Sequence, residues 1–403
     1  MIRFIEFVIA LAIVLVLFVV VGLILPSERH LEERVETNRR MTIVFDTINN
    51  IRRLNDWNSL VPVLEEEVKY SGGDDLTGVG ARLDYASSDP RWGEGFWEIT
   101  ESERPETGGS GKVVFNIDDS RPGHDKNSVV TVEPTGLRGR NVEVTQTYSV
   151  QYGWNLFGRF TGMYVSRNVG DQIKAGLARL ANMLATVPNY DYRVEGSRLT
   201  DLGVVEMPGE NVLVVNAGNI DRNNDVIKAS IAANREWIKR VMETNDLVPA
   251  GPVRIITTDF GSEKYAFDVA QPVRKRSSAT RDENGAAADE QDADAEAGAA
   301  DATAAAEGAP QRGVGLPPAT EPLDAVKVAG TPVEYVRLEP RRAASGSYTG
   351  YMAELDSVRN AIRAWAMTQG YEVAGRPYEE WENGVDDAFT ADGEFDVFWE
   401  IKQ

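Results

Sequence analysis

The sequence predicts an α+β protein that is anchored to a membrane near its N-terminus. Three patterns support this fold class: an uninterrupted apolar run near the start, a series of short strand-like segments followed by an amphipathic helix, and a repeat of strand and helix signals in the second half. They divide the chain into an anchor at 1–30, a first domain at 31–190 and a second domain at 203–403.

The apolar run at 7–25 contains nineteen residues without a charge or a proline. A run of about 20 apolar residues matches the roughly 30 Å hydrocarbon core of a bilayer, where a helix pairs all of its own backbone groups. A cleaved signal peptide is the alternative, but small residues would then precede the cleavage site. Because Leu23, Ile24, Leu25 and Pro26 follow instead, we expect a retained transmembrane helix.

The charges that flank this run leave its orientation open. The arginines after the run outnumber Arg3 before it, and by the positive-inside rule this would place the body in the cytoplasm. Long domains, however, cross a membrane regardless of charge. We expect a single pass through a bacterial inner membrane, with the body on the extracytoplasmic side.

The composition excludes several classes of function. The formal net charge is −21, whereas a nucleic-acid partner would require a basic surface. There is no cysteine, which excludes disulfides, thiolate catalysis and cysteine-bound zinc. The two histidines, His30 and His124, argue against a Ser-His-Asp triad and a multi-histidine metal site. We therefore expect no metal, no cofactor and no nucleic-acid partner.

The first domain is predicted to begin with a strand at 31–37 and a short helix at 41–50. Five β-rich runs separated by polar turns come next, at 79–85, 96–101, 111–117, 128–133 and 142–151. A long amphipathic helix follows, with Ile173, Leu177, Leu180 and Leu184 on one side. These elements predict one antiparallel sheet with a helix packed behind it.

The segments MTIVFDTINNIRRLNDWNSL at 41–60 and GLARLANML at 176–184 give this domain a family likeness. It resembles the START-like superfamily, also called the SRPBCC or polyketide cyclase/dehydrase-like group. The resemblance implies a helix-grip fold with an apolar cavity between the sheet and the last helix. It also implies binding of lipid-like or other small molecules, with a minority of members being enzymes.

Aromatic residues are the candidates for lining that cavity: Trp57, Trp92, Phe96, Trp97, Trp154 and Phe157. The alternative is that most of them are ordinary core or rim residues, because aromatic side chains dominate protein cores in any case. Acid–base chemistry would have to use carboxylates such as Glu98 or Asp84.

The second domain contains an internal repeat. The pair Ala250-Gly251 recurs as Ala374-Gly375, and the tripeptide FDV at 267–269 recurs at 395–397. Each half then consists of strand, helix, AG turn, strand and strand. The strands are predicted at 211–215, 253–259 and 264–270 in the first half, and at 333–338, 378–382 and 394–402 in the second.

Alternation along the last strand separates two sets of residues. One set should pack on the helices: Phe395, Val397, Trp399 and Ile401. The other set forms an acidic surface with one large aromatic: Glu394, Asp396, Phe398 and Glu400. That surface is either a solvated side of the sheet or the floor of a groove.

The duplicated layout, the segment SGSYTGYMAELDSVRNAIRAWAMTQGYEVAGRPYEEW at 345–381 and the ending FDVFWEIK resemble the GyrI-like domain. This is the effector-binding domain of MerR-type and AraC-type regulators. The resemblance implies a cleft lined by aromatics, often with an acid for cationic, drug-like ligands. The residues carried over are Tyr348 and Tyr351 at the start of the helix, with Tyr378, Glu380, Phe398 and Glu400 on the strands.

The two halves are separated by an insertion at 274–325. Its centre, 281–307, has nine acidic residues and one arginine, and is otherwise mostly alanine and glycine. Such a segment buries too little apolar surface to offset its ordering entropy, so we expect it to be disordered. An alanine-rich helix is the alternative, which Gly285, Gly298 and Gly308 disfavour.

The function expected from these patterns is membrane-anchored, non-catalytic binding or sensing of a small hydrophobic or amphipathic ligand. The expected partner is a small apolar or cationic organic molecule. One alternative is a cyclase-like or hydrolytic enzyme that uses carboxylates in the START-like cavity. Another is a scaffold protein with vestigial pockets.

Overall fold

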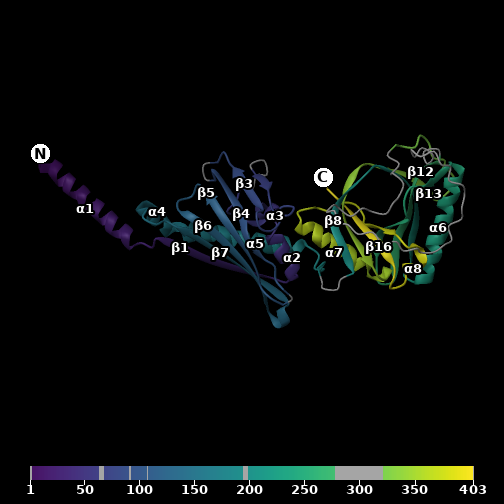
Figure 1. Ribbon diagram of the computed structural model, residues 1–403, viewed down its shortest axis with the longest axis horizontal. Coiled ribbons are helices and arrows are strands. Elements are labelled where there is room, and N and C mark those ends of the chain that lie inside the picture. Colours follow the sequence, from purple (N-terminus) through teal and green to yellow (C-terminus); the bar gives the residue numbers. More distant parts are fainter. Residues whose placement is uncertain are drawn as a thin grey trace, which may run out of the picture. The chain divides into compact units, whose positions relative to one another are not determined.

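A computed structural model of the chain describes residues 2–62, 68–89, 92–106, 108–193, 198–276 and 321–402. The chain forms two compact units. The first comprises Met1–Val194 together with Arg363–Tyr371, and the second comprises Glu195–Ile362 together with Glu372–Gln403 (Figure 1).

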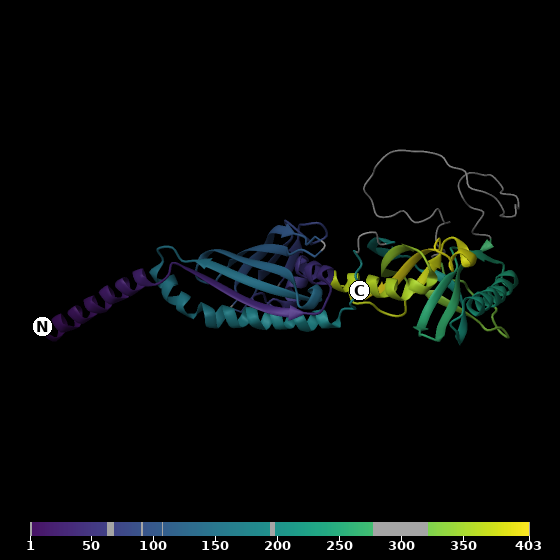
Figure 2. The same cartoon turned by 90° about the horizontal axis from the view of Figure 1, so that it is seen from below.

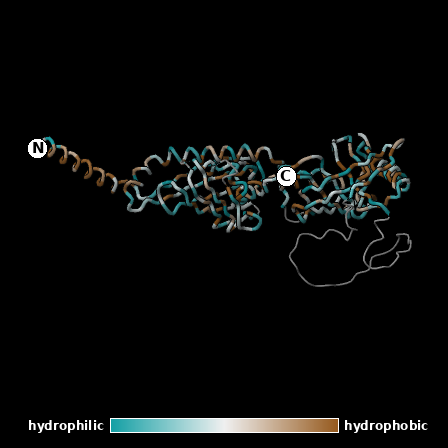
Figure 3. Tube along the Cα trace, turned by 90° about the horizontal axis from the view of Figure 1, so that it is seen from above, coloured by the Kyte–Doolittle hydropathy of each residue, from teal (hydrophilic) through white to brown (hydrophobic). Residues whose placement is uncertain are grey.

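The first unit begins with helix α1 (Ile2–Ile24), which is long and apolar enough to cross a membrane. Only 6% of its most apolar window is buried, whereas the core helix of a soluble protein would be mostly buried. Figure 3 shows the helix as a nearly continuous hydrophobic stretch. It is therefore a membrane anchor or a signal sequence.

The body of the first unit is a seven-stranded antiparallel sheet in the order β1-β7-β6-β5-β4-β3-β2. Short helices α2 (Met41–Ile48) and α3 (Ile51–Trp57) lie in the chain between β1 and β2. The strands are β1 (Glu28–Thr37), β2 (Val68–Ser71), β3 (Arg82–Ala86), β4 (Glu94–Glu103), β5 (Gly111–Asp119), β6 (His124–Thr135) and β7 (Asn141–Gln151). The five predicted β-rich runs all fall on strands, and β2 is an additional strand.

A helical segment follows β7 and leads to the long helix that packs against the sheet (Figure 2). Its parts are α4 (Leu156–Thr161), the 3-10 turn η3 (Gly162–Tyr164), the π-helical turn η4 (Ser166–Gly170) and α5 (Asp171–Thr186). In α5 the predicted residues Ile173, Leu177, Leu180 and Leu184 are all buried. The alternating burial along β7 supplies the opposite wall of this core.

The second unit is built on a nine-stranded antiparallel sheet, with eight strands in the order β13-β9-β12-β11-β15-β16-β14-β8 and β10 paired to β12. The strands are β8 (Leu199–Met207), β9 (Glu210–Asp221), β10 (Leu247–Pro249), β11 (Arg254–Phe260), β12 (Lys264–Lys275), β13 (Val333–Leu338), β14 (Arg341–Thr349), β15 (Tyr378–Trp381) and β16 (Glu394–Ile401). The helices are α6 (Asn224–Thr244), α8 (Gly384–Asp387) and the first part of α7 (Leu355–Thr368), whose residues from Arg363 onward belong to the first unit.

The structure differs from three sequence predictions. The strand that precedes α7 is β14, whereas 333–338 forms β13 beside β9. Tyr348 consequently lies in β14 and not at the start of a helix. The insertion was predicted to begin at Arg274, but β12 continues through Lys275 because β10 pairs with its end. The central part of the insertion, 277–320, lies outside the described residues.

Candidate functional site

A cavity of about 230 Å³ lies in the first unit between β7 and the helical segment that follows it. Its lining includes Tyr148 and Val150 from β7, Val169 from η4, Gln172 from α5 and Arg121 from the turn between β5 and β6. An apolar cavity of about 150 Å³ already accepts benzene, so this one has room for a small organic molecule.

Two polar groups of the lining lack a partner within the described part of the chain. Tyr148 is 2% exposed, and its hydroxyl makes no hydrogen bond there. The Oε1 atom of Gln172 is buried and likewise unpaired. Burial, and then the charge of Asp119, raise the pKa of Tyr148, so the phenol stays neutral and can donate. Because an unpaired buried polar group costs about 1–3 kcal/mol, the Gln172 Oε1 atom calls for a partner inside the cavity, and the Tyr148 hydroxyl is free to donate a hydrogen bond there as well.

A buried charged cluster adjoins the cavity. The Lys126 Nζ atom donates to Asp119 Oδ1 at 2.5 Å, to the Asp119 carbonyl at 3.0 Å and to the Arg121 carbonyl at 2.6 Å. Arg121 in turn donates from Nη1 to Asp119 Oδ2 at 2.9 Å. All three ammonium hydrogens of Lys126 are therefore engaged. The cluster holds the turn that carries Arg121 and does not supply a free base.

The predicted cavity aromatics lie elsewhere in the first unit. Trp57 and Trp97 are fully buried, and Trp97 packs edge-on against Phe115 with ring centroids 5.8 Å apart. Phe96 lies under the Arg82 guanidinium at 3.7 Å, and Trp92 under Arg121 at 5.6 Å. None of the four lines the 230 Å³ cavity, and their role in ligand binding stays a prediction.

The cavity's own aromatics are Tyr148 and Tyr152, which the sequence analysis missed. A signal for Tyr148 was present. Alternation along β7 places Tyr148 and Val150 on the buried side of the strand together with Val142 and Val144.

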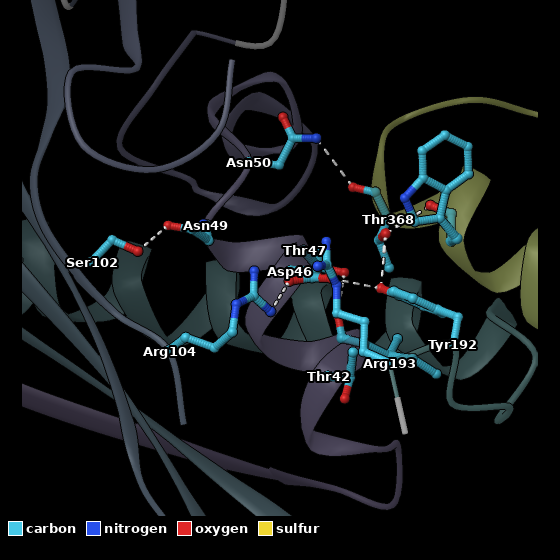
Figure 4. Close-up of polar contacts among 12 residues, drawn as sticks. Thr42, Asp46, Thr47, Asn49, Asn50, Ser102, Arg104, Tyr192, Arg193 and Thr368 are labelled. Atoms are coloured by element: carbon cyan, nitrogen blue, oxygen red, sulfur yellow. Dashed lines mark hydrogen bonds and ion pairs between the residues drawn. The ribbon is translucent and has the colours of Figure 1, made fainter. Parts of the chain in front are cut away.

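A second polar network in the first unit centres on the buried carboxylate of Asp46 (Figure 4). Asp46 accepts from Arg104 at 2.6 Å, from the Tyr192 hydroxyl at 3.0 Å and from Arg193 Nε at 3.1 Å. The Tyr192 hydroxyl also lies 3.1 Å from Thr368 Oγ1. Because these contacts satisfy the carboxylate internally, we assign the network to stability.

In the second unit, three of the predicted residues gather around Arg254. Tyr378 and Phe398 are buried and stack with centroids 4.9 Å apart. Arg254 lies over the Tyr378 ring at 5.0 Å and donates from Nε to Glu380 at 2.8 Å. Its two other nitrogens bind Glu210, each at 2.8 Å. Glu380 therefore already has a positive partner within the protein.

The remaining predicted residues differ in exposure. Tyr348 is buried, donates to Glu354 and stacks on Phe395 at 6.1 Å, while Tyr351 is 48% exposed. Glu400 is half-buried on β16, and within the described residues its carboxylate makes no ion pair. For these residues, as for Tyr378, Glu380 and Phe398, ligand binding stays a prediction.

The ion pairs of Glu210 lower the pKa of this carboxyl. Burial alone would raise it, but the hydrogen bonds and charge of Arg254, together with those of Arg341, outweigh burial. A carboxyl whose pKa is lowered by folding stabilises the protein at pH values above its ordinary value of 4.5. This contribution is lost as the pH falls through the lowered pKa of the folded state.

We therefore expect the unfolding free energy of the second unit to decrease as the pH falls below 4.5. Glu210→Gln removes the titrating group, so its stability should depend less on pH over the same range. The protein is unfolded in urea at each pH, and a brief hydrogen-exchange pulse at one common pH then labels the unfolded molecules. The labelled fraction of peptides from β9 gives the unfolding free energy of the second unit. If the unfolding free energies of the natural protein and of Glu210→Gln changed with pH in parallel, Glu210 would not be the group that causes the change.

A larger groove of about 750 Å³ lies in the second unit between α6 and the strands β10 and β12. Ile238, Met242 and Leu247 contribute apolar lining, and Arg235 and Glu236 contribute opposite charges. Across the described residues, no group of three or more histidine, aspartate or glutamate side chains could hold a metal ion.

No protein-family model matches this chain, and no curated protein matches its sequence. Among solved structures it is similar to norcoclaurine synthase from Thalictrum flavum in complex with dopamine and hydroxybenzaldehyde. There the TM-score is 0.30 at 12% identity, over 39% of this chain and 87% of that one. A solution structure from Thermobifida fusca has a TM-score of 0.29 at 19% identity, over 39% of this chain and 93% of that one. The EcmrR C-terminal domain has a TM-score of 0.32 at 12% identity, over 50% of this chain and 97% of that one. These TM-scores are too low to assign the chain to a family.

Proposed function

We propose that this protein is a membrane-anchored, non-catalytic binding protein for a small apolar or amphipathic molecule. The observation that carries the proposal is the cavity of the first unit, in which the Tyr148 hydroxyl and the Gln172 Oε1 atom have no partner within the described residues. Apolar walls with a few oriented polar groups are typical of small-molecule sites.

The two groups suggest the chemistry of the ligand. Tyr148 offers a donor and Gln172 an acceptor, so a ligand hydroxyl could accept from one and donate to the other. Val150, Val165 and Val169 provide apolar surface for the rest of the molecule. The full internal pairing of Lys126 favours binding over acid–base catalysis.

We also propose a family for each unit. The order strand, two short helices, six strands and long helix supports a START-like, helix-grip first unit. The second unit repeats the order strand, helix, strand, strand. The first copy is β9, α6, β11 and β12, the second is β14, α7, β15 and β16, and β11 lies beside β15 in the sheet. This order supports a duplicated, GyrI-like effector-binding domain. Glu400, which has no ion pair among the described residues, is then the carboxylate proposed for a cationic ligand.

For α1 we propose a retained single-pass anchor in a bacterial inner membrane, with the body on the extracytoplasmic side. The exposed apolar surface of the helix and the absence of small residues before a cleavage site support retention.

The role of Tyr148 can be tested with the full chain in lipid nanodiscs, using benzyl alcohol and toluene as probes that differ by one hydroxyl. The natural protein should bind benzyl alcohol roughly fivefold more tightly than toluene, the equivalent of about 1 kcal/mol for one hydrogen bond. Tyr148→Phe should remove this preference and leave toluene binding unchanged. Calorimetric titration measures both, with empty nanodiscs as the blank.

The matched control is Tyr190→Phe, because Tyr190 is 38% exposed and is not part of the cavity lining. This variant should keep the natural preference. If Tyr148→Phe retained the full preference for benzyl alcohol, the cavity would not be the binding site.

A further inference from the structure

The segment between β7 and η4, residues 153–164, has an unusually apolar surface. Trp154 is 84% exposed, Phe157 73%, Met163 53% and Tyr164 61%. Outside α1, the described part of the chain exposes ten large apolar side chains, and four of them lie in this one segment. Scattered single apolar residues need no explanation, whereas a cluster of this kind marks an interaction surface.

The outer surface of the segment carries no charge. Its one charged residue is Arg159, which is 9% exposed. The Arg159 Nη1 atom donates to the carbonyls of Gly22 and Leu23, each at 3.3 Å, and of Leu25 at 3.2 Å. These carbonyls belong to the end of α1, where the helix offers them no amide partner. Arg159 thus caps the anchor helix and leaves the aromatic side chains outermost.

The segment also packs along the last turns of α1. Phe18 stacks on Phe160 with centroids 4.6 Å apart and contacts Phe157 at 5.8 Å. Figure 1 shows α4 beside the end of α1. Phe18 precedes the last helical residue, Ile24, by six positions, which corresponds to about 9 Å along the axis. If α1 spans a bilayer and ends at its surface, α4 lies at the depth of the interface.

We propose that residues 153–164 form a second membrane contact, an interfacial element that inserts Trp154, Phe157, Met163 and Tyr164 into the headgroup region. This inference rests on the proposed role of α1 as an anchor. Direct continuity with that helix favours a lipid surface as the partner. Tryptophan and tyrosine are enriched at membrane interfaces, and interfacial helices bury their apolar side about 5–10 Å deep.

This contact bears on how a ligand reaches the cavity. Thr161 belongs to the interfacial segment, and Val165, Asn168 and Val169 follow it directly, and all four line the cavity. One wall of the cavity is therefore continuous with the element that contacts lipid. The class of ligand this arrangement fits is an amphiphile that partitions into the bilayer and enters from the interface.

The natural absence of cysteine allows single labels to test the proposal. Nitroxide labels on Phe157→Cys and Met163→Cys are placed in the full chain reconstituted into phosphatidylcholine/phosphatidylglycerol vesicles. The accessibility of each label to oxygen and to a water-soluble nickel chelate is then measured. Leu137→Cys is the matched control. Leu137 is 78% exposed and lies before the other end of the eleven-residue β7, about 35 Å from the segment. Leu11→Cys reports on α1.

The ratio of oxygen to nickel accessibility should be roughly tenfold higher at positions 157 and 163 than at 137, as expected for labels about 5–10 Å below the surface. Position 11 should give the highest ratio. If the oxygen-to-nickel ratio were as low at positions 157 and 163 as in water, but high at position 11, the interfacial contact would be overturned and the anchor would stand. An aqueous ratio at 11 would refute the anchor itself. Unchanged circular dichroism verifies that each labelled protein is folded.

Discussion

Replacing Arg254 by methionine should lower the unfolding free energy of the second unit by about 3–5 kcal/mol. The Arg254 side chain is 6% exposed and pairs with Glu210 and Glu380, whose side chains are 10% and 11% exposed. Methionine fills much of the same space but leaves two buried carboxylates without their main counter-charge. The loss should be larger than for any surface ion pair in this unit, because exposed pairs contribute about 0–1 kcal/mol.

A unit-specific probe makes this measurable. Val215 in β9 is 1% exposed, so a cysteine placed there reacts with a thiol reagent only when the second unit opens. Lys264→Met is the control, because it breaks an exposed pair with Asp221 at 2.5 Å. Adding Glu210→Gln and Glu380→Gln to Arg254→Met should recover much of the loss. A loss in Arg254→Met no greater than in Lys264→Met would show that the cluster does not stabilise the unit.

In the first unit, Asp119→Asn should produce the largest loss of stability, about 3 kcal/mol or more. The Asp119 side chain is 1% exposed and is the carboxylate partner of both Lys126, 2% exposed, and Arg121. The amide keeps the shape of the side chain but removes the charge, so the Lys126 ammonium stays buried without its counter-ion. We also expect the turn that carries Arg121 to loosen, and with it one wall of the cavity.

Asp84→Asn is the matched control for this substitution. Asp84 pairs with Arg82 at 2.7 Å in the same sheet, but its side chain is 44% exposed, so the variant should lose at most about 1 kcal/mol. Thiol labelling of a cysteine at Val132, which is 1% exposed in β6, reports opening of the first unit. Equal losses in the two variants would mean that burial of the Asp119 cluster adds nothing.

Periodicity predicted those elements whose burial alternates regularly. The period-two pattern placed strands over 111–117 and 142–151, which fall on β5 and β7, and the apolar spacing from Ile173 to Leu184 placed α5. Each of these elements has one buried side, and burial is what such patterns record.

β14 was missed for the opposite reason. Its sequence RRAASGSYT consists mostly of small and polar residues with low strand propensity, yet it is an interior strand between β16 and β8. Tertiary pairing on both edges overrides the local preference. For that reason Tyr348 was assigned to the start of a helix.

The charged partners could not be predicted at all. Glu210, Arg254 and Glu380 come from β9, β11 and β15 and meet only because of the order and register of the sheet. Glu380 was expected to bind a cationic ligand, but the strand register places the positively charged Arg254 opposite it on the neighbouring strand. The sequence contains each charge but carries no information on this pairing.

Three residues, Leu25–Ser27, connect α1 to β1, a span of at most about 10 Å. If α1 is the retained anchor that we propose, a body attached so closely to a bilayer samples only a thin layer of solution above it. A ligand that partitions into that bilayer is then more concentrated next to the cavity than in bulk water, because its apolar part is held at the membrane. A weak intrinsic affinity would suffice to keep the cavity occupied, and titration with a water-dissolved ligand would understate its occupancy in the membrane.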